Sequence, residues 1–92
     1  MKVIYKITYP NGKIYVGKDS TGDNLRYFGS PAREYLENDF SWEQQQDITL
    51  RKEILFSSAD ISEPELHKKE CEFIEQLGSN NPQKGYNLLP KM

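Results

Sequence analysis

Two short runs rich in Val, Ile, Tyr and Thr open the chain, and the junction between them restricts the fold more than any other feature. Residues 2–9 and 13–18 read as β-strands, and Pro10-Asn11-Gly12 joins them. Proline suits the second position of a type I turn, asparagine tolerates the third, and glycine takes the following left-handed position. The sequence therefore predicts an antiparallel hairpin with a three-residue loop and a glycine bulge.

The loop length decides which side chains share a face of this hairpin, because side chains alternate along a strand. With a three-residue loop, Tyr5 and Tyr15 project from the same face, whereas a two-residue Asn-Gly turn would separate them. Gly17 then lies opposite Tyr5 and leaves room beside that ring for a ligand or a backbone segment. The predicted pairs are Tyr9 with Lys13, Ile7 with Tyr15 and Tyr5 with Gly17, while Ile4, Ile14 and Val16 share the other face.

Helical and strand-like segments alternate in the rest of the chain. Ser30-Pro31 reads as an N-cap followed by a proline in the first turn, which predicts a helix over about 31–39. Ser62 and Glu65 form the pattern of a capping box, and the helix that they open ends near Leu77, before Gly78. Residues 48–56 predict a third strand with Ile48, Leu50, Ile54 and Phe56 on one face, and residues 84–90 are apolar enough to pack back on the domain.

These elements predict a small α/β fold that forms one domain over residues 1–92. The expected order is β-β-α-β-α, with a central three-stranded sheet, antiparallel or mixed, flanked by helices. A chain of 92 residues suffices for one small core, and no repeat or linker divides it.

Charge bears on the class of partner. The chain carries a net charge of −2, which argues against a strong free-standing nucleic-acid binder, because phosphate neutralisation dominates such affinity. Residues 1–33 contain six basic and two acidic side chains, a net +4, so residues 34–92 carry −6. The basic third could face phosphates, or the clustering could be chance in a small protein.

Secretion and membrane insertion have no signal in the sequence, which lacks a long apolar run and a signal-peptide core. The single cysteine, Cys71, excludes an internal disulfide and a cysteine-only zinc site. We interpret it as a small packing residue. We therefore expect an intracellular protein without a membrane partner.

Glu70 is the acid in the least expected position. It lies near the middle of the apolar stripe of the second helix, formed by Leu66, Phe73, Ile74 and Leu77. Burying an unpaired carboxylate costs several kcal/mol, on the order of the effective penalty for a buried ion. A metal ion, a buried cation or hydroxyl donors could offset that cost. The alternatives are a salt bridge to a lysine and a stripe that opens at a sheet edge.

Four more polar residues have both a structural and a functional interpretation. Lys18 and Arg26 could be ordinary surface cations, or they could hold a phosphate near the tyrosine face. His67, three residues before Glu70, could be an exposed helix residue or could assist that carboxylate and transfer protons. Asn87 could be a turn residue or could hydrogen-bond inside the site.

Taken together, these motifs resemble the GIY-YIG nuclease superfamily, and the resemblance covers nearly the whole chain. The closest similarity is to the nuclease modules of phage homing endonucleases, which share the Gly-Tyr-Asn tail. The segments that carry it are Val3-Ile4-Tyr5, Asn11-Gly12-Lys13, Tyr15-Val16-Gly17-Lys18, Glu70 and Gly85-Tyr86-Asn87.

The resemblance implies a role for each matching position. Tyr5 and Tyr15 match the tyrosines of the two motifs, and Glu70 matches the carboxylate that holds one divalent metal, Mg²⁺ or Mn²⁺. Lys18 matches a basic residue of repair members, and Asn87 matches a tail asparagine that lines the site. The family's helical arginine has Arg26 as its nearest counterpart by spacing, with Arg33 as the fallback.

The implied reaction is hydrolysis of a DNA phosphodiester bond by a metal-dependent endonuclease. The metal at Glu70 would neutralise phosphate charge and stabilise the leaving 3′ oxygen. Tyr15, more than Tyr5, would orient or deprotonate the attacking water, which requires its pKa to fall from about 10. Arg26 would clamp the scissile phosphate.

Two departures from the family pattern affect the expected partners. Val3 replaces the usual glycine of the first motif. The nuclease module also ends the chain without a zinc finger or helix-turn-helix that would read DNA sequence. We therefore expect weak specificity, a homo-oligomer, a separate DNA-targeting partner or a fragment, in a bacterial or phage-infected cytoplasm. The alternatives are an inactive DNA- or protein-binding module of the same fold and a small interaction domain whose tyrosine face docks protein.

Overall fold

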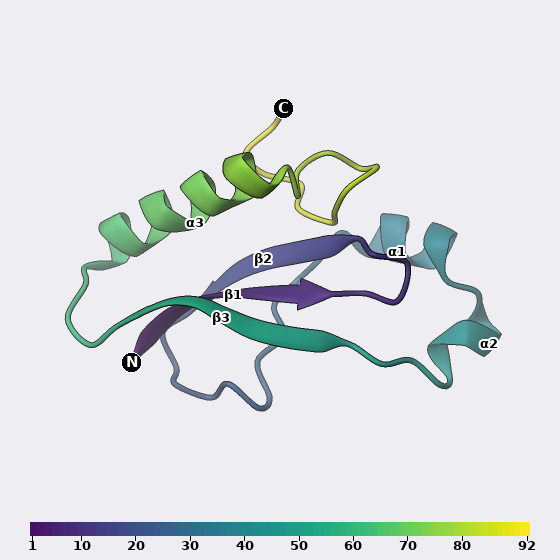
Figure 1. Cartoon of the computed structure of the whole chain (residues 1–92), viewed down its shortest axis with the longest axis horizontal. Coiled ribbons are helices and arrows are strands. Elements are labelled where there is room, and N and C mark those ends of the chain that lie inside the picture. Colours follow the sequence, from purple (N-terminus) through teal and green to yellow (C-terminus); the bar gives the residue numbers. More distant parts are fainter.

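A three-stranded antiparallel sheet forms the centre of the computed structural model, which describes residues 1–92. The strands are β1 (Lys2–Thr8), β2 (Ile14–Asp19) and β3 (Arg51–Ser58), in the order β2-β1-β3. Strand β1 is therefore central and pairs with both neighbours (Figure 1). The predicted α/β class with one three-stranded sheet is confirmed, and its strands are all antiparallel.

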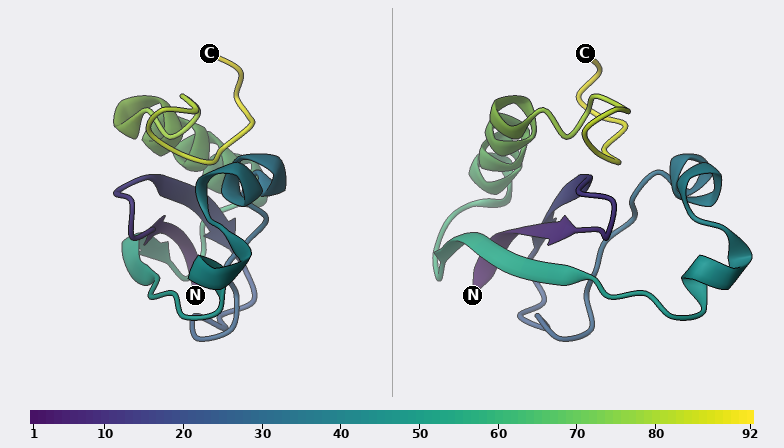
Figure 2. Two further views of the ribbon diagram at one scale, coloured as in Figure 1. Left: turned by 90° about the vertical axis from the view of Figure 1, so that its right-hand side faces the viewer. Right: turned by 45° about the vertical axis from the view of Figure 1, so that its right-hand side comes forward.

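Three helices accompany the sheet: α1 (Arg33–Asp39), α2 (Trp42–Gln45) and α3 (Glu63–Leu77). Figures 1 and 2 show α3 along one face of the sheet, with α1 and α2 together at one end of the molecule. The order is β-β-α-α-β-α, one helix more than the sequence predicts. Helix α2 has no apolar periodicity; a capping box between Ser41 and Gln44 starts its single turn.

The hairpin has the predicted register. The Tyr9 amide donates to the Lys13 carbonyl at 2.9 Å, and Gly12 occupies the left-handed region at φ +86°. Tyr5 lies opposite Gly17, so the three-residue loop is confirmed. The two faces of β1 consequently belong to two different hydrophobic clusters.

The first cluster contains both Tyr5 and the tail residue Tyr86, and the second lies between the sheet and α3. The first consists of Val3, Tyr5, Ile7, Tyr9, Ala32, Phe40 and Tyr86. The second consists of Ile4, Val16, Ile61, Leu66 and Ile74. The sheet thus separates two small cores, and each α3 residue that is fully buried belongs to the second.

The prediction of one apolar face for the third strand is wrong. Ile4 pairs with Phe56 and Tyr5 with Ile54, which leaves Leu55 as the extra residue of a β-bulge. The bulge shifts the alternation by one residue, so Phe56 packs against the second cluster while Leu50 packs against the first. Strand β3 also begins at Arg51 rather than at residue 48.

Helix α1 begins later than predicted. Its N-cap is Ala32, which makes no side-chain cap, rather than Ser30. The Ala32 amide donates to the Tyr86 carbonyl at 2.9 Å, and the Ser30 amide donates to the Tyr15 hydroxyl at 3.2 Å. Contacts with distant segments therefore occupy the residues that the local pattern assigns to the first turn.

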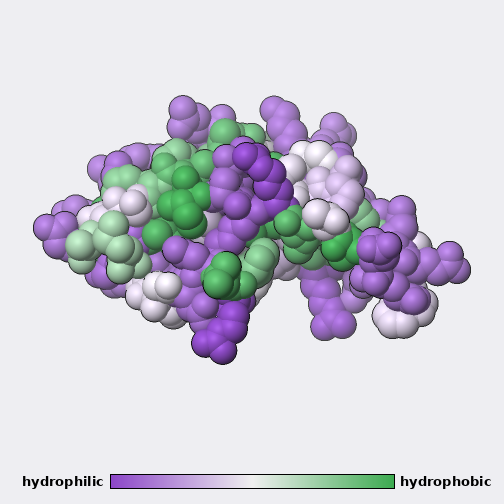
Figure 3. All heavy atoms as spheres, turned by 60° about the horizontal axis from the view of Figure 1, so that its bottom comes forward, coloured by the Kyte–Doolittle hydropathy of each residue, from purple (hydrophilic) through white to green (hydrophobic).

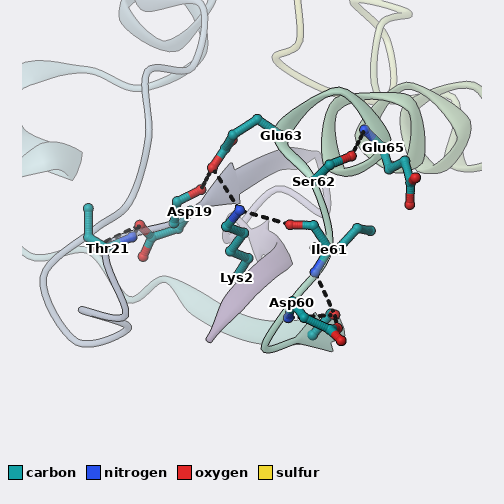
Figure 4. A network of polar contacts seen from close by, with 10 residues as sticks. Lys2, Asp19, Thr21, Asp60, Ile61, Ser62, Glu63 and Glu65 are labelled. Carbon is teal, nitrogen blue, oxygen red and sulfur yellow. Dashed lines mark hydrogen bonds and ion pairs between the residues drawn. The ribbon is translucent and has the colours of Figure 1, made fainter.

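Helix α3 begins and ends where predicted, but only half of the predicted capping box forms, because the Ser62 amide makes no bond to the Glu65 side chain. Ser62 is the N-cap and its hydroxyl accepts a hydrogen bond from the Glu65 amide, and the left-handed Gly78 ends the helix. Figure 4 shows this cap beside the start of the sheet. There, Lys2 donates to the Ile61 carbonyl at 2.8 Å and pairs with Glu63, which connects β1 to the first turn of α3.

The tail packs on the domain, as predicted. Gly85 forms a parallel bridge with Ile14 at the edge of β2, and Tyr86 is fully buried. The Tyr86 hydroxyl donates to Asp39 at 2.7 Å and accepts from the Asn11 amide at 2.9 Å. These bonds join the tail to the hairpin loop and to the end of α1.

The surface mixes apolar and polar side chains. Figure 3 shows apolar atoms between polar ones on one face, and Leu25, Leu88 and Leu89 are the most exposed leucines. Every helix is too short or too polar to cross a bilayer.

We predict that Asp39→Asn lowers stability in a pH-dependent way. The Lys13 ammonium at 2.7 Å and the Tyr86 hydroxyl hold the pKa of Asp39 below its ordinary value of 3.8. That contribution is present above pH 4 and disappears as the pH falls through the folded-state pKa. Urea denaturation should show a loss of about 1.5 kcal/mol at pH 7 that shrinks towards pH 3.

The exposed Asp47 provides the control, since Asp47→Asn should change the unfolding free energy by less than about 0.5 kcal/mol at either pH. An Asp39→Asn loss that is the same at pH 7 and pH 3 would contradict a role for the ionised carboxylate.

Candidate functional site

The two motif tyrosines lie side by side on one face of the hairpin, as the register predicts. Their ring centroids are 6.3 Å apart. Tyr5 is fully buried, whereas Tyr15 is only partly buried and lies nearer the surface. The two phenols therefore have different access to a ligand.

Two glycines enclose the Tyr5 hydroxyl. A Cβ atom at Gly17 or at Gly29 would collide with that oxygen, and one at Gly29 would also come within 2.6 Å of the Tyr15 ring. The space that the sequence predicts beside Gly17 exists, but the Tyr5 phenol and the backbone at Gly29 fill it. The enclosed hydroxyl has no hydrogen-bond partner.

Glu70 is largely buried, with a side chain that is 16% exposed. Burial raises the pKa of Glu70, and the positive fields of Lys18 and His67 act in the opposite direction. The nearest polar side chain is His67, with 3.5 Å between Nδ1 and Oε1, and no lysine forms a salt bridge with Glu70. The carboxylate therefore lies on the apolar side of the helix, as predicted, and no lysine or arginine forms a salt bridge with it.

A cleft of about 250 Å³ connects Glu70 with Tyr15. It lies where β2, the end of the loop before α1, helix α3 and the tail meet. Its lining consists of Tyr15, Ser30, His67, Glu70, Ile74, Asn87, Leu88 and Leu89. The structure thus brings together four of the predicted site residues, Tyr15, Glu70, His67 and Asn87, from three distant parts of the chain.

Asn87 lies in the cleft wall, but its side-chain amide is already engaged. Oδ1 accepts from the Val16 amide at 2.9 Å, and Nδ2 donates to the Val16 carbonyl at 2.8 Å. The Asn87 side chain therefore makes the pair of hydrogen bonds with Val16 that a residue of a neighbouring strand would make at this edge of β2. It fixes the point from which Leu88 and Leu89, 62% and 66% exposed, project at the cleft.

The two candidate arginines lie outside the cleft. Arg26 is 87% exposed and pairs with Asp23 at 2.7 Å, and Arg33 is 89% exposed and pairs with Glu37 at 2.8 Å. Neither contributes to the cleft lining. Lys18, on β2, is only partly exposed.

Lys52 lies near the site, although the sequence motifs do not include it. Its Nζ lies 4.6 Å from the Tyr5 ring centroid and donates to the carbonyls of Asn24 and Tyr27 at 2.9 and 2.6 Å. It thereby ties the loop before α1 to the tyrosine face. The signal was available, because Lys52 alternates with Leu50 and Ile54 and so falls on a face predicted to be apolar.

Both phenols are protonated at neutral pH. Burial raises the pKa of Tyr5 and of Tyr15, and the Glu70 carboxylate raises both further. Proton abstraction by a tyrosine requires a lowered pKa, whereas the surroundings within the protein raise the pKa of both phenols. Tyr15, the phenol that lines the cleft, is therefore suited to donating a hydrogen bond.

Glu70 is the only acid in the cleft, and no group of three or more His, Cys, Asp or Glu side chains could hold a metal ion. One carboxylate fits a cation that keeps most of its waters, as Mg²⁺ does. The incompletely compensated charge of Glu70 agrees with such an ion.

Comparisons of this chain with protein-family models, curated proteins and solved structures found no match. The sequence motifs and the geometry of the cleft are therefore the features that bear on function.

We predict opposite stability changes for the same substitution at two buried tyrosines. Tyr5→Phe removes a buried hydroxyl without a partner and should stabilise the protein by about 1 kcal/mol. Tyr86→Phe removes the hydrogen bonds to Asp39 and Asn11 and should cost about 1.5 kcal/mol. Urea denaturation at pH 7 measures both. A clear loss of stability in Tyr5→Phe would show that its hydroxyl has a partner.

Proposed function

We propose that this protein is a metal-dependent DNA endonuclease of the GIY-YIG type. The observation that carries the proposal is the cleft in which the second-motif tyrosine, Tyr15, and the largely buried Glu70 lie together. A binding module has no need for a carboxylate in this position, whose burial is costly without a cation.

Glu70 would hold one Mg²⁺ or Mn²⁺ through its carboxylate. When bound, such an ion neutralises phosphate charge and stabilises the leaving oxygen of a phosphodiester. Lys18 adds a positive field to the same carboxylate and supports its ionised form, which is the form that binds a cation.

Tyr15 would act as a hydrogen-bond donor in the cleft. The Ser30 amide already donates to its hydroxyl oxygen, which leaves the phenolic proton free to point elsewhere. Since its pKa is raised, Tyr15 is better suited to orient the attacking water or a phosphate oxygen than to remove a proton. Of the two roles that the resemblance implies for Tyr15, orienting the attacking water and deprotonating it, the raised pKa favours the first.

Tyr5 would position Tyr15 rather than contact substrate. It is fully buried and does not line the cleft. Its ring contacts Tyr15 on one side and Tyr27 at 6.1 Å on another, and Lys52 lies over it. Its bulk therefore holds the hairpin face and the loop before α1 at a constant separation.

Arg26 would reach a phosphate by exchanging partners. It is highly exposed and its partner is the nearby Asp23, so a phosphate could replace that carboxylate at small cost. Arg33 would have to leave Glu37 in the same way. The basic first third of the chain agrees with DNA as the substrate, in a bacterial or phage-infected cytoplasm, with weak specificity, oligomerisation or a targeting partner.

One observation favours a second candidate, a DNA-binding module without catalysis. That observation is the absence of both arginines from the cleft lining. A binding module needs no arginine beside a scissile phosphate, whereas the endonuclease requires one of them to move there. The cleavage assay separates the two candidates.

We predict that the protein nicks supercoiled plasmid at low salt in the presence of Mg²⁺ or Mn²⁺ and not with EDTA. Glu70→Gln should reduce the rate about 100-fold or more, because it removes the charged ligand. Glu72→Gln, an exposed change on the same helix, should leave the rate within about twofold.

Cleavage that persists in EDTA or in Glu70→Gln would overturn the metal assignment. A folded wild type that retains DNA but never cleaves it would instead identify the binding module.

A further inference from the structure

Helix α3 carries three residues of metal-binding type about one helical turn apart, and two of them, His67 and Glu70, line the cleft. His67, Glu70 and Cys71 have the spacing i, i+3 and i+4, which places the side chains of Glu70 and Cys71 each beside that of His67. The His67 Nδ1 faces the Glu70 carboxylate at 3.5 Å, and its Nε2 faces the Cys71 sulfur at 3.7 Å. The imidazole thus lies between an acid and a thiol.

The separation between His67 and Glu70 is longer than a good hydrogen bond, which spans about 2.7 to 3.2 Å. It matches two ligands of one ion. Ligand bonds of about 2.1 Å to a tetrahedral cation place the nitrogen and the oxygen about 3.4 Å apart. The two atoms are therefore spaced to share a metal without movement of the helix.

The other ring nitrogen has the partner that metal binding requires. A histidine that ligates through Nδ1 must carry its proton on Nε2, and this N–H normally donates to a neighbouring acceptor that orients the ring. In this protein the sulfur of Cys71, 3.7 Å from Nε2, is placed to accept from that N–H in the metal-bound tautomer. Since it faces the opposite nitrogen, Cys71 would orient the ligand and not bind the ion.

We propose that His67 and Glu70 together bind the divalent cation, so that the cleft prefers Mn²⁺, Co²⁺ or Zn²⁺ to Mg²⁺. This inference rests on the proposed function, because it completes the metal site in the same cleft. Imidazole nitrogen favours the later transition metals, whereas Mg²⁺ prefers oxygen ligands. His67 lines the cleft and is 62% exposed, so an ion can reach it.

Calorimetric titration of the protein with CoCl₂, MnCl₂ and MgCl₂, without DNA, tests the site directly. His67→Ala should weaken Co²⁺ binding about tenfold or more and change Mg²⁺ binding less than about twofold. Cys71→Ser should bind Co²⁺ within about threefold of wild type, since the serine oxygen can still accept from Nε2. The sequence contains one histidine, so a Zn²⁺-dependent change in the ¹⁵N chemical shift of its Nδ1 reports the metal–nitrogen bond by NMR.

Equal Co²⁺ affinity in wild type and His67→Ala, or an Nδ1 resonance that saturating Zn²⁺ does not shift, would overturn the inference. Plasmid cleavage by His67→Ala with Mg²⁺ tests the proposed function separately. A variant that cleaves normally, with unchanged Co²⁺ affinity, would refute the histidine ligand and leave the nuclease intact. Loss of Co²⁺ binding in His67→Ala would support the ligand pair even if the wild type cleaves no DNA.

Discussion

The register of the first hairpin is the constraint on which the rest of this structure depends. Gly12 takes the left-handed position of a three-residue loop, and the pairing that follows places Tyr5 and Tyr15 on the same face. A loop shorter by one residue would turn Tyr15 to the other face of the sheet, away from Tyr5 and from the loop before α1. The hairpin also divides the hydrophobic residues of β1 between two cores, so its register determines which segments can pack on each side.

The tail and α3 convert this hairpin into a cleft. Asn87 uses both polar atoms of its side chain on Val16, which anchors the tail to the outer edge of β2. Helix α3 lies across the same strand and presents Glu70 beside it. The acid, the tyrosine and the tail thus come together because all three segments use one strand edge. This packing buries the Glu70 carboxylate, which is energetically unfavourable. Lys18 and His67 compensate for that burial only in part, since the pKa of Glu70 stays raised.

Elements with strong local signals were predictable from the sequence, and elements that long-range contacts shape were not. The hairpin loop and both ends of α3 follow from proline, glycine and serine at particular positions. The predicted start of α1 was wrong because the Ala32 amide donates to the Tyr86 carbonyl, far along the chain. The predicted apolar face of β3 was wrong because Leu55 is an extra residue, a β-bulge, in its pairing with β1. Helix α2 was missed because one turn is too short to show a period.

For the candidate site, the sequence by itself determined which residue types were available and which two tyrosines face the same way. It also placed Glu70 on the apolar side of a helix, because helical periodicity is a local property. The tertiary structure alone decided that Tyr15, rather than Tyr5, lines the cleft. It also decided that the Asn87 side chain hydrogen-bonds to the β2 backbone and that both arginines lie outside the cleft. The reason is that the exposure of a side chain and its hydrogen-bond partners depend on segments far apart in the chain. A local sequence pattern does not show which distant segments come into contact.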